Sequence, residues 1–396
     1  MQKNYSTAYL TAVCCSVYLV MGMAFSMIGV GLEEFAGQLS SSATTVGSLF
    51  FLCQGGASFL MLFAVGPLID RLGQRPVLIA GSLLCAVSMA GLTRVESLSE
   101  ACGILFVMGA GGAGLNGGVN TLVNYLFPQN PGRALNLSNI FFGLGAVSLP
   151  FMAGWLLNSL ELKGLLWITA GICAVPALLL FFGGFPVGVR VELFSLRSAF
   201  RTLGDTRVAL FGSIVFLYVG LEASLGIWSR PALIELWKLK NPLDQFVLSG
   251  YWGAIVVGRL LAGTVFQHIE GHRLVWRCSL GAVIGLAVFN LAGSVYVAAF
   301  ALWFSGLCFA PIFPSTLGCV GRTFTNYTGT IFSLMIALGV LGGVVVSTLV
   351  GKIAGTSALA HGFYLVLAVC LAMLALQTIV LRRAQKEVQG THKSAI

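Results

Sequence analysis

Apolar stretches long enough to cross a lipid bilayer follow one another along almost the whole chain. A spanning helix needs about 20 predominantly apolar residues, and twelve stretches meet that criterion. They lie near residues 8–30, 43–65, 76–93, 101–126, 134–158, 164–184, 208–229, 246–267, 275–293, 295–320, 330–351 and 358–381. The sequence therefore predicts an all-α integral membrane protein with twelve transmembrane helices.

Composition supports a membrane protein and argues against several other classes. Only 9% of the 396 residues are charged, whereas a soluble domain carries about 25%. The net charge of +9 does not indicate nucleic-acid binding, because no basic run with interleaved aromatic residues occurs. The ten cysteines form no Cys-x-x-Cys pair, so we expect neither a metal site nor a cofactor.

The distribution of Lys and Arg predicts the orientation in the membrane. Loops on the side of the two termini hold 15 of the 22 basic residues, the opposite loops hold six, and Arg259 lies within a span. Because cytoplasmic loops carry the excess of Lys and Arg, both termini are predicted to be cytoplasmic. We expect a multi-pass protein of the plasma (cell inner) membrane, in contact with lipid and monomeric.

The spans divide into two groups of six. The longest polar stretch, residues 186–207, alternates Arg with apolar residues and is typical of a short helix on the cytoplasmic surface. It separates a predicted N-terminal bundle (1–185) from a C-terminal bundle (208–382), which a cytoplasmic tail (383–396) follows. Shifting the sequence by 197 residues superposes seven pairs of glycines, as two parallel repeats would require.

The loop after the second span carries a motif. Residues 66–78 read GPLIDRLGQRPVL, which resembles the loop motif of the major facilitator superfamily. We interpret this segment as a cytoplasmic gate formed by Gly66, Asp70, Arg71, Gly73 and Arg75. The glycines would let helix ends approach, Asp70 would bond neighbouring helix N-termini, and the arginines would anchor at the anionic leaflet. The corresponding segment of the second half, GTVFQHIEGHR, is degraded.

Further segments resemble one branch of that superfamily, the fucose permease and glucose/galactose transporter group. They are NLSNIFFGLGAVSLPFMAGWLL (136–157), YVGLEASLGIW (218–228), SGYWGAIVVGRLLAG (249–263) and GLCFAPIFPS (306–315). The resemblance implies solute transport by alternating access, often with protons. The branch's carboxylates in the first and fourth helices are missing here, so its proton sites do not carry over. Glu33 and Glu34 lie only at the outer end of the first span.

Glu222 is an ionisable residue inside the seventh span, slightly outside the midplane. A charged side chain at that depth costs on the order of 3 kcal/mol and by default marks a functional site. Tyr218 and Gly226 share its helix face. We interpret Glu222 as a site for a proton or for a polar or cationic solute; the alternative is a buried carboxylate that only holds helices together. Arg259 lies several ångströms nearer the cytoplasm, so we expect a structural role for it, bonding helix ends there.

Other polar residues are candidates for lining a central cavity. Asn116 and Asn120 fall on one stripe of the fourth span, where they would bind hydroxyl groups of a solute or hold helices together. Gln54, Asn139 and Trp252 are further candidates.

Together these features predict a secondary active transporter of a small polar solute, a sugar or sugar-like compound, with protons as the coupling ion. One alternative is a proton antiporter that exports amphipathic or cationic compounds, favoured by the 28 Phe and an incomplete antiporter motif at 143–154. A second is a membrane scaffold or receptor that no longer transports. The sequence contains no nucleophile–base pair, so we do not expect an enzyme.

Overall fold

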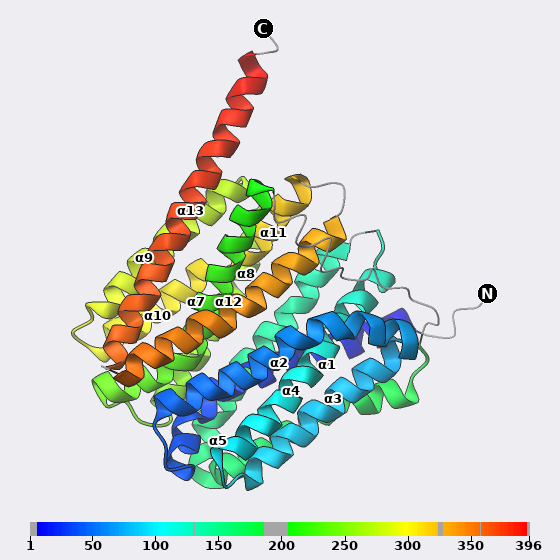
Figure 1. Cartoon of the computed structure of the whole chain (residues 1–396), viewed down its shortest axis with the longest axis vertical. Helices are drawn as coiled ribbons and strands as arrows, with labels where there is room; N and C mark the ends of the chain where they lie inside the picture. Colours follow the sequence, from blue (N-terminus) through cyan, green and yellow to red (C-terminus); the bar gives the residue numbers. More distant parts are fainter. Residues whose placement is uncertain (1–5, 130, 186–204, 324–327, 357, 394–396) are drawn as a thin grey trace.

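The computed structural model describes residues 6–129, 131–185, 205–323, 328–356 and 358–393, and every regular element in these ranges is helical. The elements are α1 (Thr7–Gln38), α2 (Ala43–Leu72), α3 (Gln74–Gly91), the short 3-10 helix η1 (Leu92–Arg94), α4 (Leu98–Leu126), α5 (Pro131–Phe182), α7 (Thr206–Trp237), α8 (Leu243–Thr264), α9 (Gly271–Asn290), α10 (Val295–Phe309), α11 (Ile312–Thr323), α12 (Thr328–Thr356) and α13 (Leu359–Lys393). Figure 1 shows them as one bundle. The predicted surface helix at 186–207 lies almost entirely outside the described residues.

Eleven segments of the described chain are long and apolar enough to span a membrane. The difference from the twelve predicted spans arises in α5, which contains both the fifth and the sixth. Glu161 interrupts it with φ 54° and ψ −178°, and contacts with α1 show that the chain reverses there. Leu162 lies against Gly31 near the end of α1, whereas Leu179 accepts a hydrogen bond from Tyr9 near its start. The second part of α5 therefore runs back along α1.

The ends of the bundle are named here by α1. The terminal face is the end at which α1 begins and α2 ends; the distal face is the end at which α1 ends and α2 begins. Small polar side chains begin several helices. Ser6, Ser42, Ser97 and Ser294 each accept a hydrogen bond from the backbone N–H three residues later, which satisfies one of the free donors at each helix start.

Two helix boundaries differ from the prediction in ways that matter for the site. The sequence predicts that the seventh span ends at residue 229, but α7 continues to Trp237, so Arg230 lies inside a helix rather than in a loop. At the other end of the chain, α13 continues to Lys393 and projects beyond the bundle (Figure 1). The expected tail after residue 382 is therefore helical over most of its length.

Helices from the two sequence halves pack together toward the distal face. The distal part of α2 runs antiparallel to the distal part of α12, where Thr44 meets Gly355, Ser48 meets Gly351 and Gly55 meets Val344. In Figure 1 these two helices diverge toward the terminal face. The backbones of α1 and α7 also meet, since a Cβ built on Gly29 would lie 2.1 Å from the carbonyl oxygen of Gly226. Glycine at this position permits backbone contact between the halves.

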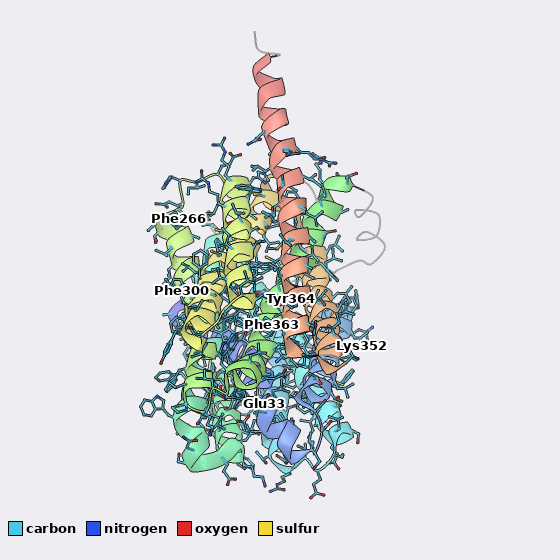
Figure 2. All side chains as sticks on the ribbon, turned by 90° about the vertical axis from the view of Figure 1, so that its left-hand side faces the viewer. Glu33, Phe266, Phe300, Lys352, Phe363 and Tyr364 are labelled. Atoms are coloured by element: carbon cyan, nitrogen blue, oxygen red, sulfur yellow. The ribbon has the colours of Figure 1, made fainter. Side chains whose placement is uncertain are left out.

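The outer surface is apolar, as a bilayer requires. Figure 2 shows Phe300 and Tyr364 on the outside of the bundle, and their exposed fractions are 68% and 52%. The neighbouring Phe363 is buried and stacks on Phe289, with ring centroids 4.7 Å apart. Apolar side chains thus face both inward and outward, which is typical of helices surrounded by lipid.

Candidate functional site

Glu222 lies in the middle of α7 as part of a polar cluster. One carboxylate oxygen accepts a hydrogen bond from the Tyr218 hydroxyl at 3.0 Å and lies 3.4 Å from the Arg259 guanidinium. The Tyr251 hydroxyl donates to the Glu222 backbone carbonyl at 3.3 Å. We call Tyr218, Glu222, Tyr251 and Arg259 the Glu222 cluster. The prediction that Tyr218 shares a face with Glu222 is confirmed by the first of these bonds.

The expected partner of Arg259 is wrong. The sequence predicts that Arg259 lies several ångströms nearer the terminal face than Glu222 and bonds helix ends there, but the guanidinium reaches Glu222. The estimate from helical rise omits the length of an arginine side chain, which extends several ångströms along the helix axis. The ion pair is only partly shielded, with exposed side-chain fractions of 19% for Arg259 and 11% for Glu222.

The charge of Glu222 is compensated by only a few groups in the Glu222 cluster. A carboxylate in a low-dielectric interior stays ionised only while hydrogen-bond donors and a cation compensate its charge. Adding a proton to Glu222 would end the ion pair and leave the guanidinium to other acceptors. Arg259 already has one nitrogen, Nε, that is buried and meets no acceptor among the described residues. The cluster therefore combines a carboxyl group that can be protonated with a cation that has a hydrogen-bond donor unused within the described chain.

An aromatic layer adjoins this cluster, because Trp252 contacts the ring of Tyr251 with ring centroids 5.1 Å apart. Trp252 packs against Gly226 and contacts Phe25 of α1 edge to face, with ring centroids 5.7 Å apart. Phe25 in turn contacts Phe51 of α2 and Phe142 of α5. The layer of Phe25, Phe51, Phe142 and Trp252 thus joins both sequence halves. The indole N–H of Trp252 is buried and has no acceptor within the described chain.

The predicted asparagines form a second polar chain in the N-terminal half. The Tyr18 hydroxyl donates to the Asn120 carbonyl oxygen, and the Asn120 amide donates to the Asn116 carbonyl oxygen. Two other predicted residues bond backbone carbonyls instead: Gln54 donates to Ala24, and Asn139 donates to Leu135 of its own helix. The structure therefore groups Asn116 and Asn120 with Tyr18, while the role of Gln54 and Asn139 in a cavity stays a prediction.

The loop motif lies at the terminal face, between α2 and α3. Gly66 lies within α2 and Gly73 ends it, while Arg71 is exposed. Arg75, expected at the lipid surface, instead donates hydrogen bonds to the carbonyls of Leu180 and Phe181 at the end of α5, because free carbonyls at a helix end attract a cation. The side chain of Asp70 lies outside the described set, so its expected bonds stay a prediction.

Gly73 adopts φ 85° and ψ 163°, a backbone conformation that is essentially restricted to glycine. We expect Gly73→Ala to destabilise the folded protein by about 1–3 kcal/mol, measured as a lower thermal unfolding temperature in detergent. Gly112→Ala is the matched control, since a Cβ there meets nothing within 4 Å and alanine favours a helix. Equal stability of the two variants would contradict the assignment of strain to this turn.

Sequence reasoning missed a charged network at the distal face. Arg230 is 3% exposed and binds Glu34 of α1 and Asp244 of α8. A signal for it is present in the sequence: apolar residues continue after Arg230 from Pro231 to Ile234, so α7 has room to extend past this charge.

Comparisons with known proteins agree with this architecture. The family model described as Major Facilitator Superfamily matches residues 14–347. A glucose/mannose transporter of Bacillus subtilis is 25% identical over 62% of this chain and 63% of its own length, so that alignment spans less than two thirds of the relative. A glucose/galactose transporter of Brucella abortus is 22% identical over 85% of each chain.

Solved structures resemble the fold over nearly its full length. A variant of the Escherichia coli fucose:proton symporter gives a TM-score of 0.67 at 18% identity, covering 94% of this chain and 99% of that one. A variant of a nucleoside transporter gives a TM-score of 0.74 at 15% identity over the same shares. With a family model that covers most of its length, the chain belongs to the Major Facilitator Superfamily and is a multi-pass membrane transporter rather than an enzyme.

Proposed function

We propose that this transporter moves a sugar or sugar-like solute across the membrane by alternating access and couples that movement to protons. The names of its relatives support the substrate class, since two of them are glucose/mannose and glucose/galactose transporters. The proposal places the terminal face in the cytoplasm, in keeping with the excess of Lys and Arg on that side. The two sequence halves, 1–185 and 208–382, would be the bodies that rock.

The observation that carries the proposal is the partly shielded ion pair between Glu222 and Arg259 inside the membrane. An intramembrane pair of this kind is costly to maintain and marks ion or substrate pathways. In the proposed cycle, a proton on Glu222 releases Arg259, and solute hydroxyl groups take the place of the carboxylate beside the guanidinium. Loss of the proton restores the pair and expels the solute.

The packing of the halves supports one assignment within that cycle. The contacts of α1 with α7 and of α2 with α12 lie toward the distal face, and the aromatic layer joins the halves beside the Glu222 cluster. A solute beside Glu222 would then be separated from the distal side by these helix contacts. We assign the structure to the state that is closed at the distal face, and the cytoplasmic side would provide the open route.

A binding experiment tests the substrate class. Thermal stability of the purified protein is measured against hexoses, nucleosides, organic acids and amphiphilic cations, because a ligand present at about 100 times its Kd stabilises the folded state by about 2.7 kcal/mol. We expect a hexose to stabilise the wild type, Glu96→Gln, whose carboxyl group is exposed, and Glu222→Gln, which resembles the protonated carboxyl group. It should not stabilise Arg259→Gln, which lacks the cation that the solute would bind. Stabilisation by amphiphilic cations alone would favour the export alternative, and no stabilisation by any compound would favour a scaffold.

A further inference from the structure

Arg230 uses three nitrogen atoms in the network at the distal face. Its Nε donates to Asp244 of α8 at 2.8 Å. Its Nη1 and Nη2 donate to the two carboxylate oxygens of Glu34 at 2.7 and 2.6 Å, and Nη1 also donates to the carbonyl of Val30. A guanidinium that binds one carboxylate through two parallel hydrogen bonds is held both strongly and in a fixed orientation.

The partners of Arg230 come from different sequence halves. Glu34 and Val30 belong to α1, whereas Asp244 follows Arg230 in the C-terminal half. Gln245, next to Asp244, adds a further link by donating to the Val30 carbonyl at 2.9 Å. The network therefore fastens α1 to α7 and α8 at the distal face, close to the backbone contact between Gly29 and Gly226.

The two carboxylates of the network are not equivalent. The Asp244 side chain is 2% exposed and shares its half of the chain with Arg230, while the Glu34 side chain is 29% exposed and belongs to the other half. If the halves separated here, Glu34 would move into water as an ordinary solvated carboxylate. Arg230 would keep Asp244 as its counter-ion. The separation would therefore avoid leaving a buried charge unpaired, which is strongly destabilising.

We propose that Arg230 is a latch for the distal face, permanently paired with Asp244 and released from Glu34 each time that face opens. The latch rests on the proposed alternating access. Its role is conformational: it adjusts how much of the time the distal face is closed, without contact to the solute. Release from Glu34 is possible because Arg230 has two carboxylate partners and stays paired with Asp244 when Glu34 leaves.

The latch is tested by the accessibility of a buried position between the halves. Ser249 is 6% exposed, and its hydroxyl donates to the Val147 carbonyl across the contact between α8 and α5. In a Ser249→Cys background, reconstituted protein is treated with a water-soluble maleimide, and the labelling rate at position 249 is followed by peptide mass spectrometry. Measuring that one peptide keeps the ten native cysteines out of the result.

Glu34→Gln and Asp244→Asn form a matched pair, since each removes one negative charge and leaves Arg230 with one carboxylate. Glu34→Gln weakens the link between the halves, so we expect its labelling rate to rise about tenfold, the factor expected for loss of a charged hydrogen bond. Asp244→Asn keeps the link but leaves Arg230 without a counter-ion when the face opens, so its labelling rate should fall below that of the parent. If Glu34→Gln does not fold, Glu34→Asp serves, with a smaller rise in the same direction.

Equal labelling rates in the two variants, or no rise in the Glu34 variants, would overturn the latch. The readout needs no solute, so it is independent of transport. A chain that labels as expected but moves no sugar keeps the latch and loses the proposed function. A chain that moves a sugar but labels alike in all variants loses the latch alone.

Discussion

Glu222→Gln is expected to abolish accumulation of solute driven by a proton gradient, while the folded protein persists at reduced stability. Glutamine cannot bind and release a proton, and it leaves Arg259 without a carboxylate at 3.4 Å. Losing one partner of a buried ion pair costs about 3–5 kcal/mol. Because the Arg259 side chain is 19% exposed, water compensates part of this loss, and we expect about 2 kcal/mol. Uptake into proteoliposomes and thermal unfolding measure the two effects.

Comparison with a double variant separates coupling from simple damage. Adding Arg259→Gln to Glu222→Gln removes the unpaired cation, so part of the lost stability should return. Proton-driven accumulation should stay absent, because the exchangeable carboxylate is still missing. Undiminished accumulation in Glu222→Gln would show that another group carries the proton, and equal stability of the single and double variants would show that the ion pair is unimportant.

Gly29→Val is expected to produce the second large effect, by keeping the distal face from closing. A Cβ at position 29 would lie 2.1 Å from the Gly226 carbonyl oxygen, and the atom it meets is backbone rather than a flexible side chain. Overpacking at such a contact costs about 1–3 kcal/mol, so α1 and α7 must separate. Transport requires both states in turn, and we expect the uptake rate to fall at least about tenfold.

Gly37→Val provides the control on the same helix. A Cβ at Gly37 meets nothing within 4 Å, so this variant should transport near the wild-type rate. The maleimide assay at position 249 adds a second readout, since Gly29→Val should raise labelling and Gly37→Val should not. Normal uptake by Gly29→Val would contradict the close approach of α1 and α7 during the cycle.

The fold could be predicted from the sequence because each span is encoded locally. Length and apolarity alone identify the crossings, and the predicted division between the spans near 275–293 and 295–320 is confirmed as the gap between α9 and α10. Chain reversals between helices are harder to predict, because a tight turn needs few residues and leaves the helical sequence pattern almost unbroken. Within α5, the chain reverses at the single non-helical residue Glu161. The end of α7 is missed for a related reason, since a charge inside a helix resembles the start of a loop.

The site could be predicted only for residues that stand out because they are energetically costly inside a membrane. Glu222 stands out because a carboxylate in an apolar span is expensive, and Tyr218 follows from helical spacing. The pairing with Arg259 depends on the reach of a side chain across two helices, which spacing does not give. The latch is invisible in the sequence for a stronger reason: Arg230 and Glu34 are 196 residues apart and meet only when the two halves pack together.

Proton movement driven by sugar tests the central claim most directly. Wild-type protein in proteoliposomes without a pH gradient receives an inward hexose gradient, while a pH-sensitive dye records the lumen and Glu222→Gln serves as the control. The account predicts that the lumen of wild-type vesicles acidifies as sugar enters and that the Glu222→Gln vesicles show no change in pH. Sugar entry without acidification in the wild type, or equal acidification in the variant, would contradict a proton site at Glu222.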